Sequence, residues 1–302
     1  MSDTPLHLYV AHSDFKKELL KEIKSTKMDF ENYLISENKI EDSIWAQDIW
    51  FDLKEIKFES ISQAVKELKK NHSHWASDSL SHHRRAKLIQ EQLNFYKHPS
   101  LEFMGNLPKQ KFGRWLMVNE NTIWASKDCR SPIPFGKIEF NEDKKIPPSR
   151  AYLKLWEVFT IHGAIPRKNS RCIDLGSCPG GWSWVLSQLG CDVISVDKAP
   201  LDPKIAKIKN IQFLKKDAFK LKPEEVGKID WLFSDIICEP ARLFELVQVW
   251  KNSGVKNFVC TIKFKGKTDF EVVERFKKIS GARLLHLYHN KHEITWILTE
   301  KE

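Results

Sequence analysis

The sequence predicts a two-part α/β protein, in which a smaller α+β domain over residues 1–145 precedes a domain with a mostly parallel, seven-stranded sheet over residues 146–302. Three observations lead to this prediction. Strand-like apolar runs alternate with helical segments throughout the second part, as in doubly wound sheets. The last two runs are too close together for a helix between them, so they must form an antiparallel hairpin. The 302 residues are 41% hydrophobic, which is enough for two buried cores.

The first part contains two strand–helix units and a hairpin. A strand is expected at Leu6–Val10, followed by an amphipathic helix over residues 13–23. A second strand-like run, Ile49–Leu53, precedes a helix that begins with a capping box at Ser60. Residues 113–126 alternate apolar and polar side chains around a polar centre, which predicts a β-hairpin.

A segment rich in histidine and arginine follows the second helix. Its H-x-H and H-H spacings occur in metal sites, but no carboxylate or cysteine pattern accompanies them, so we expect no metal. A solvated basic helix face and an RNA-contacting face are the other interpretations. The residues concerned are His72, His74, His82, His83, Arg84, Arg85 and Lys87.

The second part begins near two adjacent prolines, Pro147 and Pro148, which interrupt the periodicity. Five apolar runs then alternate with glycine turns or helical stretches, and each is expected to be a strand of the parallel sheet. These runs are residues 171–175, 191–197, 211–217, 229–235 and 257–263. Residues 283–289 and 293–299 are joined by only residues 290–292 and are expected to form the closing hairpin.

Acidic residues lie at the ends of four of the five parallel strands, and a lysine ends the fifth. They are Asp174, Asp197, Asp217, Asp235 and Lys263. Any one aspartate after a strand is most simply explained as a helix cap. Because ligands of open α/β sheets bind outside the carboxyl ends of the strands, the whole set predicts one ligand crevice.

A turn with the sequence G-S-C-P-G-G follows the first strand and lets the backbone approach a ligand. It lacks the lysine of a phosphate-binding P-loop and the G-x-G-x-x-G spacing of a dinucleotide site. Asp197 lies where an acid that accepts both ribose hydroxyls is expected, and Asp217 can accept from an adenine amino group. These features favour S-adenosylmethionine (AdoMet) as the cofactor.

Seven stretches follow the order of one known family from residue 147 to 295: PPSRAYLKLWEVF, DLGSCPGGWSW, SVDKAP, DAFKLKP, DWLFSDIICEPA, TIKFKGKTDFEVV and LYHNKHEIT. They resemble the FtsJ-like branch of the Rossmann-like class I methyltransferases, and more closely the RlmM family of bacterial 23S rRNA cytidine ribose 2′-O-methyltransferases. The stretches LHLYVAHSDFKKELLKEI and IPFGKIEF resemble that family's N-terminal part. The resemblance implies an AdoMet-dependent enzyme that acts on 23S rRNA or a large-subunit precursor, and no DNA substrate.

The resemblance implies four catalytic residues, Lys154, Asp235, Lys263 and Glu293, with Lys263 as the proton acceptor for the ribose 2′-hydroxyl. A hydroxyl is a very weak acid, so its attack on the methyl group of a sulfonium requires a positioned base. A lysine can act as that base only when neutral. A nearby ammonium at Lys154 would lower the pKa of Lys263 and the carboxylates would raise it, so the sequence leaves the net direction open.

The resemblance also assigns cofactor contacts to the glycine-rich turn and the strand ends. The expected cofactor-binding residues are Asp174, Gly176, Cys178, Pro179, Gly180, Gly181, Trp182, Asp197, Asp217 and Asp235. Where the family has a serine before the first catalytic lysine, this chain has Ala151, which removes one hydroxyl contact. The part before residue 145 is shorter than in the family, so we expect a ferredoxin-like RNA-docking domain in which the THUMP module is reduced or absent.

Charge and cysteine usage agree with this interpretation. The 49 Lys and Arg outnumber the 40 Asp and Glu, and the formal net charge of +9 favours contact with a polyanion such as RNA. The 6 cysteines form no C-x-x-C pair and are expected to be reduced thiols. The chain shows no signal-peptide or membrane-span pattern, so a cytoplasmic protein without a membrane partner is expected.

Two other functions remain open. An RNA base methyltransferase often has an N/D-P-P-Y/F motif or a catalytic cysteine after the fourth strand, where this chain has Cys238 but no aromatic residue beside a proline. A noncatalytic RNA-binding protein with a degenerate methyltransferase domain would be expected to lose members of the catalytic tetrad. All four are present in this sequence.

Overall fold

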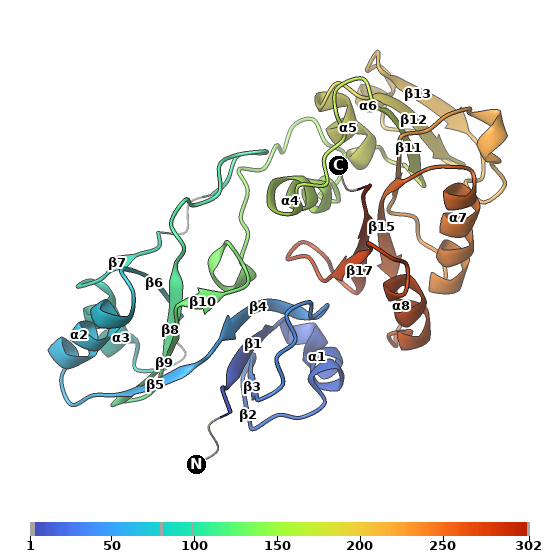
Figure 1. The fold of residues 1–302 in the computed structure, drawn as a ribbon. Coiled ribbons are helices and arrows are strands. Elements are labelled where there is room, and N and C mark those ends of the chain that lie inside the picture. The colour runs from blue at the N-terminus through green and yellow to red at the C-terminus, as the bar shows by residue number, and fades with distance from the viewer. Residues whose placement is uncertain (1–3, 79–80, 98–99, 301–302) are drawn as a thin grey trace. The chain divides into compact units, whose positions relative to one another are not determined.

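The computed structural model describes residues 4–78, 81–97 and 100–300 of the chain. It divides into two compact units, residues 1–139 and 140–302 (Figure 1). Each unit has its own buried side chains. None of the helices within the described ranges is long and apolar enough to cross a bilayer.

The first sheet of unit 1 is antiparallel throughout. Its strand order is β10 (Asp128–Cys129), β4 (Ala46–Phe51), β1 (His7–Ala11), β3 (Tyr33–Ser36) and β2 (Met28–Phe30). A 3-10 turn, η1 (Ser13–Phe15), leads into α1 (Lys16–Ile23). The helix buries Leu19 and Ile23 completely, as the predicted spacing requires.

The second sheet of unit 1 contains the predicted hairpin. Its strand order is β5 (Lys54–Lys57), β9 (Thr122–Ser126), β8 (Gly113–Asn119), β6 (His74–Asp78) and β7 (Asn94–Phe95). Strands β8 and β9 pair antiparallel, which confirms the hairpin over residues 113–126. The helices are α2 (Ile61–Asn71), α3 (His83–Gln90) and the 3-10 turn η2 (Pro134–Gly136).

The capping prediction for α2 is confirmed, and the histidine-rich segment divides between a strand and the basic helix face considered above, since His83, Arg84 and Lys87 are exposed on α3. Ser60 Oγ accepts a hydrogen bond from the Gln63 backbone N–H. His74 lies in strand β6, beside the fully buried Trp75, so this part of the segment is a core strand rather than a helix face. Within the part of the chain that the structure describes, no three His, Cys, Asp or Glu side chains are grouped to hold a metal.

Unit 2 has the predicted fold class. The order of its seven strands is β13 (Ile211–Lys215), β12 (Asp192–Asp197), β11 (Arg171–Leu175), β14 (Trp231–Ser234), β15 (Asn257–Lys263), β17 (Glu293–Leu298) and β16 (Arg283–Leu285). The first five are parallel, and β17 pairs antiparallel with both β15 and β16. This is a mostly parallel Rossmann-like sheet that ends in an antiparallel hairpin, as the sequence predicts.

The helices of unit 2 follow the parallel strands, with one before the first strand. They are α4 (Tyr152–His162), α5 (Gly181–Gln188), α6 (Pro203–Ala206), α7 (Pro240–Asn252) and α8 (Phe270–Lys277), with a 3-10 turn η3 (Pro223–Glu225). Trp184 of α5 packs edge-to-face on Tyr152 of α4, with ring centroids 5.4 Å apart. The N-terminal part of α4 is therefore held against the helix that follows the glycine-rich turn.

The strand expected at residues 283–289 is shorter than predicted. Strand β16 ends at Leu285, and residues 286–292 form a loop (the β16–β17 loop). Within this loop, the backbone N–H groups of Tyr288 and His289 donate to the carboxylate of Glu157 on α4. This partner is a side chain more than a hundred residues away in the chain, so no local pattern reveals it.

Candidate active site

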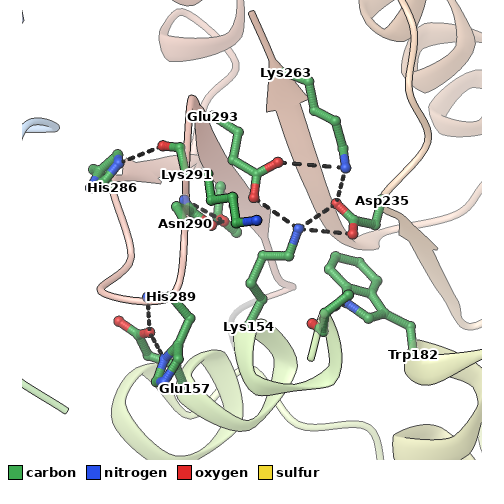
Figure 2. A network of polar contacts seen from close by, with 12 residues as sticks. Lys154, Glu157, Trp182, Asp235, Lys263, His286, His289, Asn290, Lys291 and Glu293 are labelled. Atoms are coloured by element: carbon green, nitrogen blue, oxygen red, sulfur yellow. Dashed lines mark hydrogen bonds and ion pairs between the residues drawn. The ribbon is translucent and has the colours of Figure 1, made fainter. Parts of the chain in front are cut away.

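Four charged side chains from four different elements form a closed ring in unit 2, and they are the predicted tetrad (Figure 2). Lys154 Nζ lies 2.7 and 2.8 Å from the two oxygens of Asp235 and 2.9 Å from Glu293 Oε1. Lys263 Nζ lies 2.9 Å from Asp235 Oδ1 and 3.5 Å from Glu293 Oε2. Each carboxylate therefore contacts both ammonium groups.

The sheet brings these residues together. Lys263 is the last residue of β15 and Glu293 is the first of β17, and the two are directly opposite each other in the antiparallel ladder. Asp235 follows the last residue of the neighbouring strand β14. Lys154 reaches them from the first turn of α4. Because these strands end at one edge of the sheet, residues distant in sequence become neighbours there.

The two lysines differ in their access to solvent. The side chain of Lys154 is 7% exposed, whereas that of Lys263 is 20% exposed. Lys154 is enclosed by three carboxylate oxygens and also lies 6.0 Å from the centre of the Trp182 ring. Lys263 is thus the lysine that a substrate can reach more easily, and Lys154 is the inner ion that neutralises the carboxylates.

The structure gives the direction of the Lys263 pKa shift that the sequence leaves open. Burial lowers the pKa of Lys263, but the charges of Asp235 and Glu293, together with their hydrogen bonds, outweigh burial and raise the pKa above its usual value. The resting side chain is consequently an ammonium ion. It must lose a proton before it can act as a base.

The glycine-rich turn is packed closely against the segment that carries Asp235. Gly176 has φ +80°, and a Cβ atom there would lie 2.6 Å from the Cβ of Ile236. Gly180 has φ +113°, and a Cβ atom there would lie 2.8 Å from Ile205 Cγ2. Glycine is therefore required at both positions by the backbone conformation and by the protein's own packing.

Asp197 holds the same turn from the neighbouring strand. Its Oδ2 accepts a hydrogen bond of 3.0 Å from the Cys178 N–H, and its Oδ1 accepts one of 2.9 Å from the Ala199 N–H. Pro179, Gly180 and Gly181 follow directly and lead into α5, whose first residue is Gly181. The carboxylate thus orders the turn and lies at the carboxyl edge of the sheet, as predicted.

Asp174 is fully buried beneath this turn. Its Oδ2 accepts a hydrogen bond of 2.6 Å from Ser183 Oγ, whereas its Oδ1 and the hydroxyl of Ser177 have no hydrogen-bond partner among the described residues. Burial raises the pKa of Asp174 to about 7, and the nearby charge of Asp235 adds to this, while the Ser183 hydrogen bond opposes it. Polar groups without partners at the carboxyl ends of the strands fit a polar ligand in this position.

The other predicted cofactor residues have different surroundings. Asp217 lies two residues beyond β13 and accepts a hydrogen bond of 3.0 Å from the Phe219 N–H. Trp182 is buried, and its indole N–H donates to the carbonyl of Ala151 at 2.9 Å. The hydroxyl of Ser149 lies 3.3 Å from the place of a Cβ on Gly181, so a serine hydroxyl is present near the turn although position 151 is alanine.

Sequence reasoning missed Glu157, which is only 3% exposed. Its carboxylate accepts a hydrogen bond from the backbone N–H of Tyr288 at 2.8 Å. It also accepts from the backbone N–H of His289 at 3.1 Å and from His289 Nδ1 at 2.7 Å (Figure 2). A signal was present, because Glu157 is a carboxylate in the apolar helix YLKLWEVF, three residues after Lys154. Residues at this spacing lie on one face of a helix.

Comparisons with known proteins show what unit 2 is similar to. Residues 147–282 match the sequence model of the family described as FtsJ-like methyltransferase. A Shewanella frigidimarina (strain NCIMB 400) protein named ribosomal RNA large subunit methyltransferase M is 33% identical over 175 residues, covering 51% of this chain and 48% of that protein. A protein of the same name from Azoarcus sp. (strain BH72) is 30% identical over 193 residues, covering 58% of this chain and 52% of its own.

Among solved structures, a Plasmodium falciparum protein named as a ribosomal RNA methyltransferase aligns with a TM-score of 0.40 and 20% identity. The alignment covers 50% of this chain and 97% of that protein. The present chain spans about half the length of the curated relatives that it matches.

Proposed function

We propose that this chain, whose residues 147–282 form an FtsJ-like methyltransferase domain, transfers a methyl group from AdoMet to a ribose 2′-hydroxyl of ribosomal RNA. The expected target is a cytidine of 23S rRNA or of a large-subunit precursor, in line with the names of the relatives. The observation that supports the reaction best is the closed ring of Lys154, Asp235, Lys263 and Glu293. Such a ring places a lysine base next to two carboxylates at the ligand-binding edge of the sheet.

The proposed chemistry assigns a separate task to each lysine. Lys263, once neutral, would accept the proton of the 2′-hydroxyl as the hydroxyl oxygen takes the methyl group, whose bond to sulfur breaks to leave a neutral thioether. Lys154 lies within hydrogen-bond distance of three carboxylate oxygens, which hold its ammonium group in place. Its charge stabilises the negative charge that develops on the ribose oxygen. Asp235 and Glu293 hold the two nitrogens at fixed positions throughout.

AdoMet is the cofactor of FtsJ-like methyltransferases, and it supplies an electrophilic methyl group on a sulfonium. The donor set at the strand ends fits its nucleoside. Asp197 is proposed to accept from the ribose hydroxyls and Asp217 from the adenine amino group. Asp174 Oδ1 and Ser177 Oγ are buried polar atoms without partners in the described chain, next to the turn that would hold the remainder of the molecule.

The proposed RNA partner agrees with the charge of the chain. A net charge of +9 attracts a polyanion, and unit 1 is proposed to dock the RNA. A cytoplasmic location, where ribosomal RNA is modified in bacteria, is part of the same proposal.

The alternative of a base methyltransferase with a cysteine nucleophile has less support. Burial raises the pKa of Cys238 to about 11, with only partial opposition from Arg242, so its thiol is protonated near neutral pH. The alternative of a degenerate, noncatalytic domain would not require four charges in mutual contact. The intact ring therefore favours catalysis.

The decisive experiment is to incubate the purified chain with labelled AdoMet and ribosomal RNA from a strain that lacks the gene. Nuclease digestion and mass spectrometry then locate the methyl group. We expect one 2′-O-methylated nucleoside in large-subunit RNA. A methyl group on a base would support the base methyltransferase, and absence of transfer to free RNA and to ribosomal particles would support the noncatalytic protein.

A further inference from the structure

Glu157 is a buried carboxylate that the proposed reaction does not use. It lies three residues after Lys154 on α4, so both side chains project from the same face of the helix (Figure 2). Lys154 contacts Glu293, and Glu157 contacts the backbone at Tyr288 and His289. One turn of α4 therefore contacts the segment of residues 288–293 at two places.

The β16–β17 loop, which Glu157 binds, also forms hydrogen bonds with the residue after β15 and with β17. The Phe264 N–H, next to Lys263, donates to the carbonyl of His292 at 3.1 Å. The Asn290 side chain donates to Thr295 Oγ1 at 3.1 Å. Glu157 adds the link to α4. The loop is thus fixed to α4, to the end of β15 and to β17, which carry Lys154, Lys263 and Glu293 respectively.

Glu293 begins β17 directly after this loop, so the loop and the pairing with Lys263 together determine where its carboxylate lies. That carboxylate divides its oxygens between the lysines, with Oε1 2.9 Å from Lys154 and Oε2 3.5 Å from Lys263. A shift of the loop by a fraction of these distances would break the second contact. Such a shift would leave the β15–β17 pairing intact further along the strand.

We propose that Glu157 is a positioning residue, which holds the β16–β17 loop on α4 and thereby keeps Glu293 between Lys154 and Lys263. The inference rests on the proposed function, because it takes the ring as the methyl-transfer machinery. Glu157 accepts from two backbone N–H groups and from His289 without touching a tetrad side chain through any contact in Figure 2. It acts on the reaction through Glu293.

This role predicts a change in the ionisation of Lys263. The charged groups that face Lys263 are Asp235 from the end of β14, Glu293 from β17, and Lys154 from α4 beyond them. Asp235 and Glu293 raise the pKa of Lys263 against the effect of burial. If Glu293 moves away, its contribution weakens and the pKa of Lys263 falls.

The first test compares Glu157→Gln with the wild-type protein. Glutamine has the same size, but its amide nitrogen cannot accept the second backbone N–H. We expect kcat to fall by about tenfold or more, with KM for AdoMet within about twofold, since misplacing a reacting group affects the chemical step. The pH at which kcat rises should move to lower values. His289→Ala keeps both backbone contacts to Glu157, so it should lower kcat and shift its pH dependence in the same direction but by less.

The matched control is Glu274→Gln, the same chemical change at an exposed position of α8. It should leave kcat and its pH dependence unchanged. If Glu157→Gln lowers kcat only in proportion to the loss of folded protein, with an unchanged pH profile, the residue has a structural role alone and the proposal is overturned.

A second test does not depend on activity. Competitive acylation across a pH range, read by mass spectrometry, reports the ionisation of Lys263, and hydrogen exchange reports the amides of Tyr288 and His289. In Glu157→Gln we expect Lys263 to become reactive at lower pH and both amides to exchange faster. If acylation of Lys263 and exchange of the two amides are unchanged, the positioning role of Glu157 is refuted. A wild-type protein that methylates no RNA would instead refute the proposed function. Acylation and hydrogen exchange would still test whether Glu157 positions the loop and Glu293.

Discussion

Lys154 and Lys263 contact the same carboxylate oxygen, Oδ1 of Asp235, at 2.7 and 2.9 Å. Glu293 also contacts both ammonium groups, which offsets the repulsion between them. The arrangement contains two positive and two negative groups, so its charges balance. Removing any one member leaves a surplus charge that is largely buried, and the consequences depend on which member is removed.

Replacing Lys263 with alanine should abolish methyl transfer but keep AdoMet binding. Loss of a positioned general base lowers kcat by about 10²–10⁴-fold. The nucleoside of AdoMet is expected at Asp197 and Asp217, which do not contact Lys263 in the interactions described. Single-turnover rates and calorimetric AdoMet titration measure the two effects.

Lys265→Ala is the control for the register of the motif, because Lys265 is exposed and pairs with Glu239. A larger loss of rate in Lys265→Ala than in Lys263→Ala would move the base to Lys265.

Replacing Lys154 with methionine should destabilise the protein more than the same change at Lys263. The variant leaves Asp235 and Glu293 with one counter-ion, in a site where the lysine side chain is only 7% exposed. We expect a loss of about 3–5 kcal/mol in the free energy of unfolding, as for other broken buried ion networks. For Lys263→Met, at a more exposed position, about 1–3 kcal/mol is expected. Urea denaturation monitored by tryptophan fluorescence compares the two. Equal losses would contradict the assignment of Lys154 as the inner ion.

The rate of methyl transfer should rise with pH. The pKa of Lys263 is raised above its usual value, so the neutral base is a minor species at neutral pH and increases tenfold for each pH unit. Single-turnover rates should therefore increase with a slope near one from pH about 7 to about 9. A raised folded-state pKa contributes stability that is complete below the unfolded value and is lost only as pH rises through the folded value. Unfolding should not interfere within this range. A level rate would argue against Lys263 as the base.

Asp174 should make the stability of the cofactor-free protein depend on pH between about 4 and about 7. Its folded-state pKa is raised to about 7 from 3.8, mainly by burial. Because the folded state holds the proton more tightly than the unfolded state, wild-type stability should fall as pH rises through this window and stay level above it. Asp174→Asn should lack this loss, so its unfolding free energy relative to wild type should increase by about 2–4 kcal/mol across the window. Parallel curves for the two proteins would show that Asp174 ionises normally.

Local patterns in the sequence were sufficient for the fold class. Alternating strands and helices predicted the parallel sheet, and the close spacing of the last two apolar runs predicted the antiparallel end. The hairpin over residues 113–126 and the cap at Ser60 were also predicted, because both depend on neighbours within a few residues. The strand-end positions of the acidic residues and of Lys263 followed from the same patterns. Contact among the four tetrad residues was predicted by family resemblance, not by spacing.

The tertiary structure decided what depends on distances between segments far apart in sequence. Strand β16 ends at Leu285, and the backbone N–H groups of Tyr288 and His289 beyond it donate to Glu157, a partner that no local pattern reveals. The direction of the Lys263 pKa shift also required the structure, since burial and two carboxylates act on it in opposite senses. Charge interactions depend on separation and on solvent exposure, and only the folded chain sets both.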